Sequence, residues 1–115
     1  MIVTTTATIN DHPIQEYLGV AAGEAIMGAN VLRDISSSAR DLVGGRSGSY
    51  EKVVNKARDI AMNDLIERAK ELGANAIVGI DMDYESIDRQ TGSGKSSTTS
   101  MLMVSVSGTA VRIAE

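Results

Sequence analysis

The sequence contains no cysteine, tryptophan or phenylalanine, and it has a single proline and a single histidine among 115 residues. Without cysteine the chain can form no disulfide and offers neither a thiolate nucleophile nor a zinc finger of the thiolate type. With only three tyrosines, it also lacks the aromatic platforms on which single-strand binders stack bases. No nucleophile and base pair is evident, so we expect a protein that is not an enzyme.

Charge and hydropathy exclude further classes. Fifteen acidic against eleven basic residues give a net charge of −4, which opposes binding to phosphate backbones. No run approaches the roughly 18 apolar residues of a membrane helix, and the N-terminal stretch lacks the regions of a signal peptide. We therefore expect a cytoplasmic protein that binds neither nucleic acid nor membranes. A hydrophobic content of 43% in 115 residues predicts one domain over 1–115 with a small core, which would gain from a partner.

Residues 73–85, GANAIVGIDMDYE, are predicted to form the central strand. Side chains alternate between the faces of a strand, which assigns a core face to Ala76, Val78, Ile80, Met82 and Tyr84. The second face then carries Ile77, Gly79, Asp81, Asp83 and Glu85. This second face begins apolar and ends in three carboxylates, a feature that packing alone does not require.

Three other strands are expected. Residues 2–7 suit a short edge strand that ends in a turn at 10–13. In residues 16–27 the even positions are mostly apolar and the odd positions small, so another strand layer or a neighbouring subunit should approach the small side closely. The last strand, 101–113, has a core face made by Leu102, Val104, Val106 and Ala110. The polar stretch 86–100 before it reads as a long, mobile hairpin loop.

Two helices complete the predicted elements. Apolar spacings of three and four predict a short helix over 30–43 and a long one over 50–72, which ends at Gly73. A helix covers only one face of a sheet, yet the second face also looks apolar, with Ile77, Met27, Met101 and Met103. Other copies of the chain are the expected cover for that face.

Four blocks of the sequence carry a resemblance to a known family. GVAAGEAIMGANVLRD, DLVGGRSGSYEK, GANAIVGIDMDYE and MLMVSVSGTAV resemble, in order and spacing, the YbjQ-like family, whose members of unknown function carry a heavy-metal-binding label. The resemblance implies an α+β fold, in which a small antiparallel sheet of about four strands packs on one long helix plus a short helix. It also implies a subunit similar to that of dodecin, a homopentameric ring and a bacterial or archaeal cytoplasm. No established activity comes with it, and the absence of cysteine argues against soft heavy metals.

Asp81, Asp83 and Glu85 form the first candidate site. Successive members lie about 6.8 Å apart along a strand, so two flexible carboxylates could converge on a divalent metal ion. Their oxygen ligands favour Ca²⁺, Mg²⁺ or Mn²⁺. The alternative is a solvated strand end whose charges discourage edge pairing, which is the commoner reason for such a row.

The loop before the long helix is the second candidate. Gly44, Gly45, Arg46 and Ser47 could bind an anion, because a helix N-terminus presents free amides and the arginine adds charge. The commoner explanation is a tight connection that needs glycine conformations and a serine cap.

Three weaker motifs favour structural explanations. GSGKSS at 92–97 imitates the end of a P-loop, but Arg89 stands where glycine is required and a β-rich segment follows. His12 in a turn is more often solvated than a metal ligand. A thioether site for Cu(I) from Met27, Met101 and Met103 is less common than packing at a subunit interface.

Two function classes follow from the sequence. One is an oligomeric binding module that gathers Asp81, Asp83, Glu85 or Glu24 from several subunits around a metal ion or small ligand. The other is a structural homo-oligomer with no ligand, whose assembly buries surface that one small subunit cannot cover.

Overall fold

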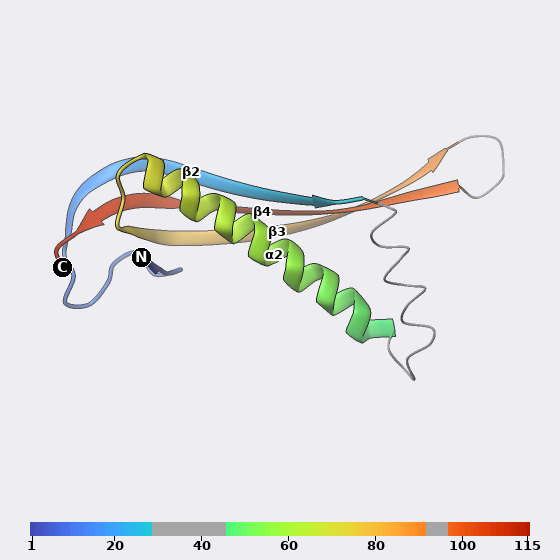
Figure 1. Cartoon of the computed structure of the whole chain (residues 1–115), viewed down its shortest axis with the longest axis horizontal. Coiled ribbons are helices and arrows are strands. Elements are labelled where there is room, and N and C mark those ends of the chain that lie inside the picture. Colours follow the sequence, from blue (N-terminus) through green and yellow to red (C-terminus); the bar gives the residue numbers. More distant parts are fainter. Residues whose placement is uncertain (29–45, 92–96) are drawn as a thin grey trace.

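The computed structural model describes residues 1–28, 46–91 and 97–115, with side chains for 1–28, 51–86 and 101–115. In chain order its elements are strand β1 (Ile2–Val3), strand β2 (Ile14–Met27), helix α2 (Arg46–Glu71), strand β3 (Ala76–Thr91) and strand β4 (Ser97–Ile113) (Figure 1). The strands form one sheet in the order β1-β3-β4-β2. The predicted α+β fold with four strands and a long helix is confirmed. The short helix predicted over 30–43 lies outside the described residues.

The sheet is mixed, whereas the sequence predicted an antiparallel one. β1 runs parallel to β3, and the other two pairs are antiparallel. β1 is an edge strand, as predicted, but only two residues long. The chain beyond it still follows β3, because the Thr4 N–H donates to the Ile77 carbonyl at 3.0 Å and the Gly79 N–H donates to the Thr6 carbonyl at 2.9 Å.

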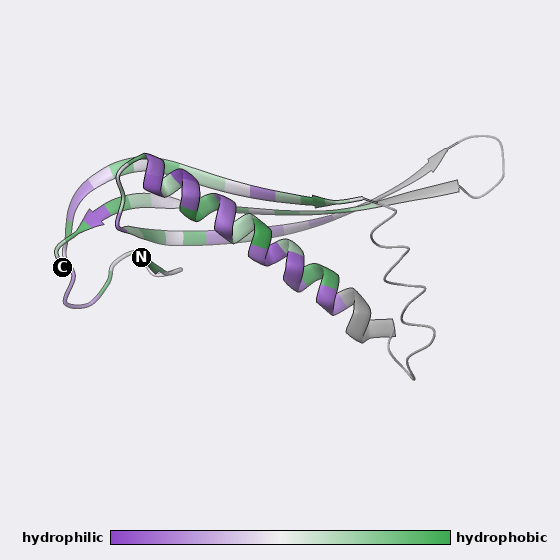
Figure 2. Cartoon of the chain, viewed as in Figure 1, coloured by the Kyte–Doolittle hydropathy of each residue, from purple (hydrophilic) through white to green (hydrophobic). Residues whose placement is uncertain are grey.

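Helix α2 lies along one face of the sheet and packs mainly on β2 and β4 (Figure 1). Its polar and apolar residues separate onto different sides, as the alternating bands of Figure 2 show. The buried stripe repeats every four residues, which keeps one side of a helix toward the sheet: Val53, Ala57, Ala61, Leu65 and Ala69. Gly73, with φ of 87°, ends the helix in the left-handed conformation, as predicted.

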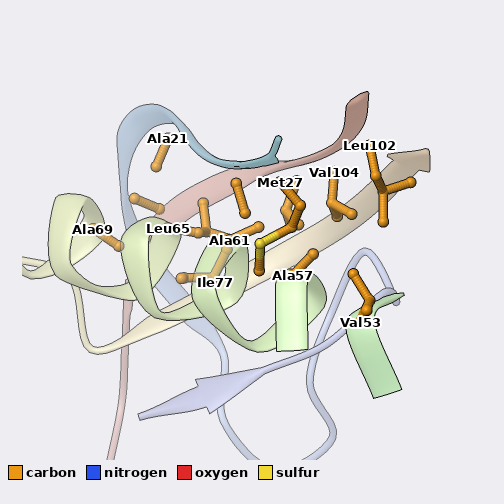
Figure 3. Close-up of a cluster of buried hydrophobic side chains, with 13 residues drawn as sticks. Ala21, Met27, Val53, Ala57, Ala61, Leu65, Ala69, Ile77, Leu102 and Val104 are labelled. Atoms are coloured by element: carbon orange, nitrogen blue, oxygen red, sulfur yellow. The ribbon is translucent and has the colours of Figure 1, made fainter. Parts of the chain in front are cut away.

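The core between helix and sheet is built almost entirely from aliphatic side chains (Figure 3). On β4 the buried residues are those expected from the alternation, Leu102, Val104, Val106 and Ala110. On β2 the prediction was wrong about which side meets the core. The small odd positions face α2 of the same chain, and Met27 belongs to this core instead of the second face.

Gly23 explains why the side chains on that side of β2 are small. A Cβ atom at Gly23 would meet the Ala61 carbonyl oxygen and would lie 2.5 Å from the Leu65 backbone nitrogen. The helix backbone therefore rests directly on the strand, flanked by the buried Ala21 and Ala25. The close approach predicted from the small residues exists, but it is made by the helix of the same chain.

A bulge at Gly79 reverses the faces of β3. The register with β4 shifts between Val78 and Asp81, and Gly79 has φ of 62°, which favours glycine. Ile77 therefore packs in the core under α2, where Ile80 and Met82 join it. Simple alternation through the whole strand is wrong, because an extra residue sends later side chains to the opposite face.

The N-terminal segment covers one end of the sheet's second face. Ala76 and Val78 of β3 and Val111 and Ile113 of β4 form a second buried cluster there, with Ile9 and Ile14 packed against it. The Ala114 N–H donates to the Pro13 carbonyl at 3.0 Å, which ties the C-terminal end of the described chain to the turn before β2. Intramolecular packing thus fills part of a face that the sequence assigned to other copies.

In the hairpin formed by β3 and β4, both strands extend further than the sequence predicted. The pairs continue to Thr91 and Ser97, so most of the stretch 86–100 is strand instead of loop. Backbone hydrogen bonds suffice for a two-stranded ladder even where the side chains show no apolar alternation.

Candidate functional site

The strongest candidate surface is the part of the sheet that faces away from α2 and lies beyond the N-terminal segment. We call it the open face. β2 contributes Val20, Ala22, Glu24 and Ile26, and β3 contributes Asp81, Asp83 and Glu85. β4 lies between them and contributes Met101, Met103, Ser105, Ser107 and Thr109. Met101 and Met103 therefore lie on the side of β4 opposite its core face, as predicted.

The Gly79 bulge places all three predicted carboxylates on the open face. Asp81, Asp83 and Glu85 are exposed, and their neighbours on β4 are Ser107, Ser105 and Met103 respectively. They share this side with Ala76 and Val78, because the bulge moved Ile77 to the other side. The sequence therefore predicted correctly that the three carboxylates share a face. It was wrong about the other residues of that face, which are Ala76 and Val78 instead of Ile77.

Glu24 lies in the same transverse line as Asp83. Both residues pair with Ser105, one from each side of β4. Two strand spacings separate their Cα atoms by about 9.6 Å. Among the described side chains of the open face there is no Lys or Arg, so within that set the four carboxylates have no cationic neighbour.

A single chain does not assemble these carboxylates into a metal centre. Within the described residues, no group of three His, Asp or Glu side chains lies close enough to hold a metal ion. The donors are oxygens, which suit hard cations, while soft heavy metals prefer sulfur and imidazole. The chain alone therefore does not fit a heavy-metal site.

The predicted anion loop is described only in part. Gly44 and Gly45 lie outside the described residues. Arg46 and Ser47 form the first turn of α2, which begins four residues before the start that the sequence predicted. The structure thus confirms that a helix begins at this loop, and the proposed anion contact stays a prediction.

The positions of the three weaker motifs in the structure fit the structural explanations. His12 is half-buried, and its Nδ1 lies 2.9 Å from the Ala114 carbonyl oxygen, which it can only approach as an N–H donor. Met27 lies under α2, while Met101 and Met103 lie on the open face, so the sheet separates Met27 from the other two thioethers. Ser97 begins β4, so a strand stands where a P-loop needs a helix.

Sequence reasoning missed Asp64. Its carboxylate accepts the backbone N–H of Glu24 at 3.1 Å, a group on the outer edge of β2, and it also pairs with Arg68 at 3.3 Å. The only sequence signal for this contact is the position of Asp64 immediately before Leu65 in the buried stripe.

Comparisons with known proteins agree with the resemblance seen in the sequence. Residues 1–114 match the YbjQ family, described as "Putative heavy-metal-binding". A UPF0145 protein of Bacillus cereus is 57% identical over 113 residues, which cover 98% of this chain and 100% of the relative. A UPF0145 protein of Bacillus thuringiensis subsp. konkukian is 56% identical with the same coverage.

A solved structure shares the fold. It is a protein of unknown function of the DUF74 family from Pediococcus pentosaceus, with a TM-score of 0.65 and 18% identity over 99% of this chain and 98% of that one. In the described part of the chain, no helix has the length and apolar character needed to cross a membrane. From the family match and the two Bacillus relatives, the chain belongs to the YbjQ family of uncharacterised UPF0145 proteins.

Proposed function

We propose that this chain is a non-catalytic, homo-oligomeric binding module whose open face binds a divalent cation or a small cationic ligand between copies. One observation carries the proposal: Glu24, Asp81, Asp83 and Glu85 are all exposed on one sheet face that carries no Lys or Arg among its described side chains. Like charges gathered on one face are unfavourable unless a counter-charge joins them.

A second copy is part of the proposal because one chain brings too few ligands together. Two carboxylates of one strand can approach a cation, and Ca²⁺ takes six to eight oxygen ligands, several of which can be water. The resemblance to ring-forming relatives implies a homopentamer, and a ring would repeat the same acidic surface at every junction. The Bacillus relatives support a bacterial setting, and we infer a cytoplasmic location from the resemblance.

The nature of the donors favours Ca²⁺, Mg²⁺ or Mn²⁺ over heavy metals. The chain has no cysteine, and the imidazole of His12 is engaged with the Ala114 carbonyl through Nδ1. The family description as heavy-metal-binding therefore finds little support in the donors of this chain, since carboxylate and hydroxyl oxygens are hard ligands.

The test is a melting comparison of the parent, Asp83→Asn and the control Asp59→Asn, which removes the same charge from the exposed surface of α2. Each is melted with chelator and then with millimolar Ca²⁺, Mg²⁺, Mn²⁺, Zn²⁺ or Cu²⁺. A cation at 100 times its Kd should stabilise the parent and the control by about 2.7 kcal/mol. Asp83→Asn should lose most of that gain. A parent melting curve that no cation moves would reject the proposed cation site.

The alternative is a structural homo-oligomer that binds no ligand. The exposure of Val20 (79%) and Ile26 (55%) on the open face favours it, because these side chains would gain from burial against another copy whether or not a cation binds. Elemental analysis of the purified protein, before and after treatment with chelator, separates the two: stoichiometric metal supports the binding module, and metal-free assembled protein supports the structural one.

A further inference from the structure

The N-terminal segment that covers one end of the sheet lies on its outside. We call residues 1–10 the strap. None of its residues is buried, and none carries a charged side chain. Four side chains of β3 and β4 beneath it are almost fully buried: Ala76 (0%), Val78 (4%), Val111 (0%) and Ile113 (4%). Ile9 is the strap side chain that packs against this cluster. The strap is therefore a thin cover over an apolar surface that belongs to the rest of the fold.

In the described chain, the hydrogen bonds from the strap to β3 join backbone atoms. The two residues of β1 pair with the start of β3. The Thr4 carbonyl then accepts the Ile80 N–H at 3.1 Å, and the Thr6 carbonyl accepts the Gly79 N–H at 2.9 Å. Gly79 and Ile80 are the residues at which β3 bulges. Because backbone groups occur in every residue, these bonds select an extended chain and not one particular sequence.

Three threonines fold the strap into a turn that aims these carbonyls at the bulge. The Thr6 N–H donates to the Thr4 hydroxyl at 3.1 Å, the two hydroxyl oxygens lie 2.8 Å apart, and the Thr6 hydroxyl donates to the Thr8 carbonyl at 2.7 Å. A hydroxyl has one hydrogen, so the Thr4 hydroxyl must donate to that of Thr6. This chain of three bonds holds only while the strap keeps the turn, so the hydroxyls stabilise the bound strap and not a released one.

The strap ends at a turn that is attached to the other end of the described chain. Asp11 has φ of 66°, the only positive value among the described residues other than glycine, and aspartate adopts this conformation more readily than most residues. Directly after it, His12 Nδ1 lies 2.9 Å from the Ala114 carbonyl oxygen, and the Pro13 carbonyl accepts the Ala114 N–H at 3.0 Å. The anchor of the N-terminal segment therefore lies after Asp11, and the strap before it can pivot at a single turn.

Release of the strap should cost much less free energy than unfolding of the domain. Segments open locally when they make few buried apolar contacts and their backbone hydrogen bonds are exposed. The strap has both features, because Thr6 and Thr8 are exposed and Ile9 is only half-buried. The core between α2 and the sheet contains no residue of the strap, so it stays packed on release. The released state then presents an unpaired edge of β3 over residues 76–80, next to the apolar cluster.

We propose that the strap releases as a unit from the folded sheet, and that the surface beneath it binds an extended, uncharged peptide in its place. The strap itself shows which chemistry fits this surface: backbone bonds to the edge of β3, β-branched residues along the chain, and one apolar side chain on the cluster. The strap is an internal competitor, so the apparent affinity for the peptide is the intrinsic affinity multiplied by the released fraction. This inference goes beyond the proposed function and requires neither a cation nor a second copy.

Hydrogen exchange of the full chain, followed by NMR, tests the release. The proteins are the parent, Thr6→Val and the control Thr5→Val, which removes an exposed hydroxyl outside the three bonds of the turn. The Gly79 and Ile80 amides should exchange faster than those of the central strand β4. Thr6→Val should accelerate them by about fivefold, the effect of one net hydrogen bond, and leave β4 unchanged, which also shows that the variant is folded. Exchange of both amides at the β4 rate in every protein would reject the release, and an equal acceleration by Thr5→Val would reject the role of the turn.

Binding of a peptide in trans tests the docking surface. The probe is a labelled synthetic peptide with the sequence of residues 2–9, IVTTTATI, followed by fluorescence anisotropy. Thr6→Val should bind it about fivefold more tightly than the parent and Thr5→Val, the same factor as in the exchange experiment, because both report the released fraction. A peptide with alanine in place of its last isoleucine should bind more weakly. Absence of saturable binding to all three proteins, or equal affinity for them, would overturn the docking surface. The melting comparison with cations tests the proposed function separately.

Discussion

Replacing Gly23 by alanine should strongly destabilise this protein, although the same change usually strengthens a strand. The added methyl group would lie 2.5 Å from the Leu65 nitrogen and 3.1 Å from the Leu65 Cα, and it would also meet the Ala61 carbonyl oxygen. All three atoms are backbone, so no side-chain rotation relieves the contact, and the helix must move off the strand. That movement also loosens the core around Leu65, which is fully buried.

The expected cost is at the upper end of the range for overpacked cores, about 3 kcal/mol. For a domain of this size it corresponds to a fall in Tm of roughly 10 °C. The assay is thermal unfolding followed by circular dichroism at one fixed protomer concentration, because association would shift Tm by mass action. Gly28→Ala is the matched control, since a Cβ there meets nothing within 4 Å.

A second variant tests the assignment of the clash to backbone atoms. Truncating Leu65 to alanine in the Gly23→Ala background should destabilise further, because the side chain that it removes is not the obstacle. A Gly23→Ala protein whose Tm stays within 2 °C of the parent would refute the close contact between helix and strand. Rescue by the Leu65 truncation would instead show that the clash is with the side chain.

Three other substitutions test separate contacts by chemical denaturation. Asn75→Ala should cost about 2 kcal/mol, because the Ile113 N–H that donates to Asn75 Oδ1 at 2.7 Å loses its acceptor. Asn75→Asp keeps that acceptor but turns its other oxygen toward the Ile113 carbonyl and the Glu115 carboxylate, to which Asn75 Nδ2 donates, so it should also be destabilising, and a neutral result for either variant would argue against this reason. Gly79→Ala should cost roughly 1 to 2 kcal/mol because of its positive φ, and Gly79→Asn should be milder; a neutral alanine would contradict the bulge conformation. Glu16→Gln should change stability by less than about 0.5 kcal/mol, since its 3.5 Å pair with Arg112 is exposed, and a larger loss would mean that this pair is part of a stronger network.

The sequence was sufficient for the elements with strong periodicity. The long helix and the last strand follow from apolar spacing, and Gly73 marks the helix end as expected for a left-handed residue. The polar stretch 86–91, which belongs to β3, was assigned to a loop because its residues show no apolar alternation. Pairing through the backbone leaves almost no trace in the sequence.

The orientation of the side chains could not be predicted at two positions. The local sequence around Gly79 is equally compatible with an ordinary strand position and with a bulge, yet the bulge decides which residues join Asp81 on its face. On β2 the apolar even positions resembled a core face, and only the three-dimensional packing shows that the helix selects the small odd positions. The carboxylate row itself was recognisable, because acidic residues at alternate positions share a face whichever way that face points.

The position of β2 in the sheet has a consequence for synthesis and folding. β2 is made early, yet its partner in the described sheet is β4, and Ile14 pairs with Ile113 near the other end of the sequence. During synthesis β2 therefore cannot form its ladder with β4 until almost the entire chain has been made. Val20 and Ile26 stay accessible until then. Contacts between residues so distant in sequence slow folding and prolong exposure of unpaired strands. Loss of the C-terminal strand during translation would leave a fragment in which β2 lacks its β4 partner, a form prone to aggregation.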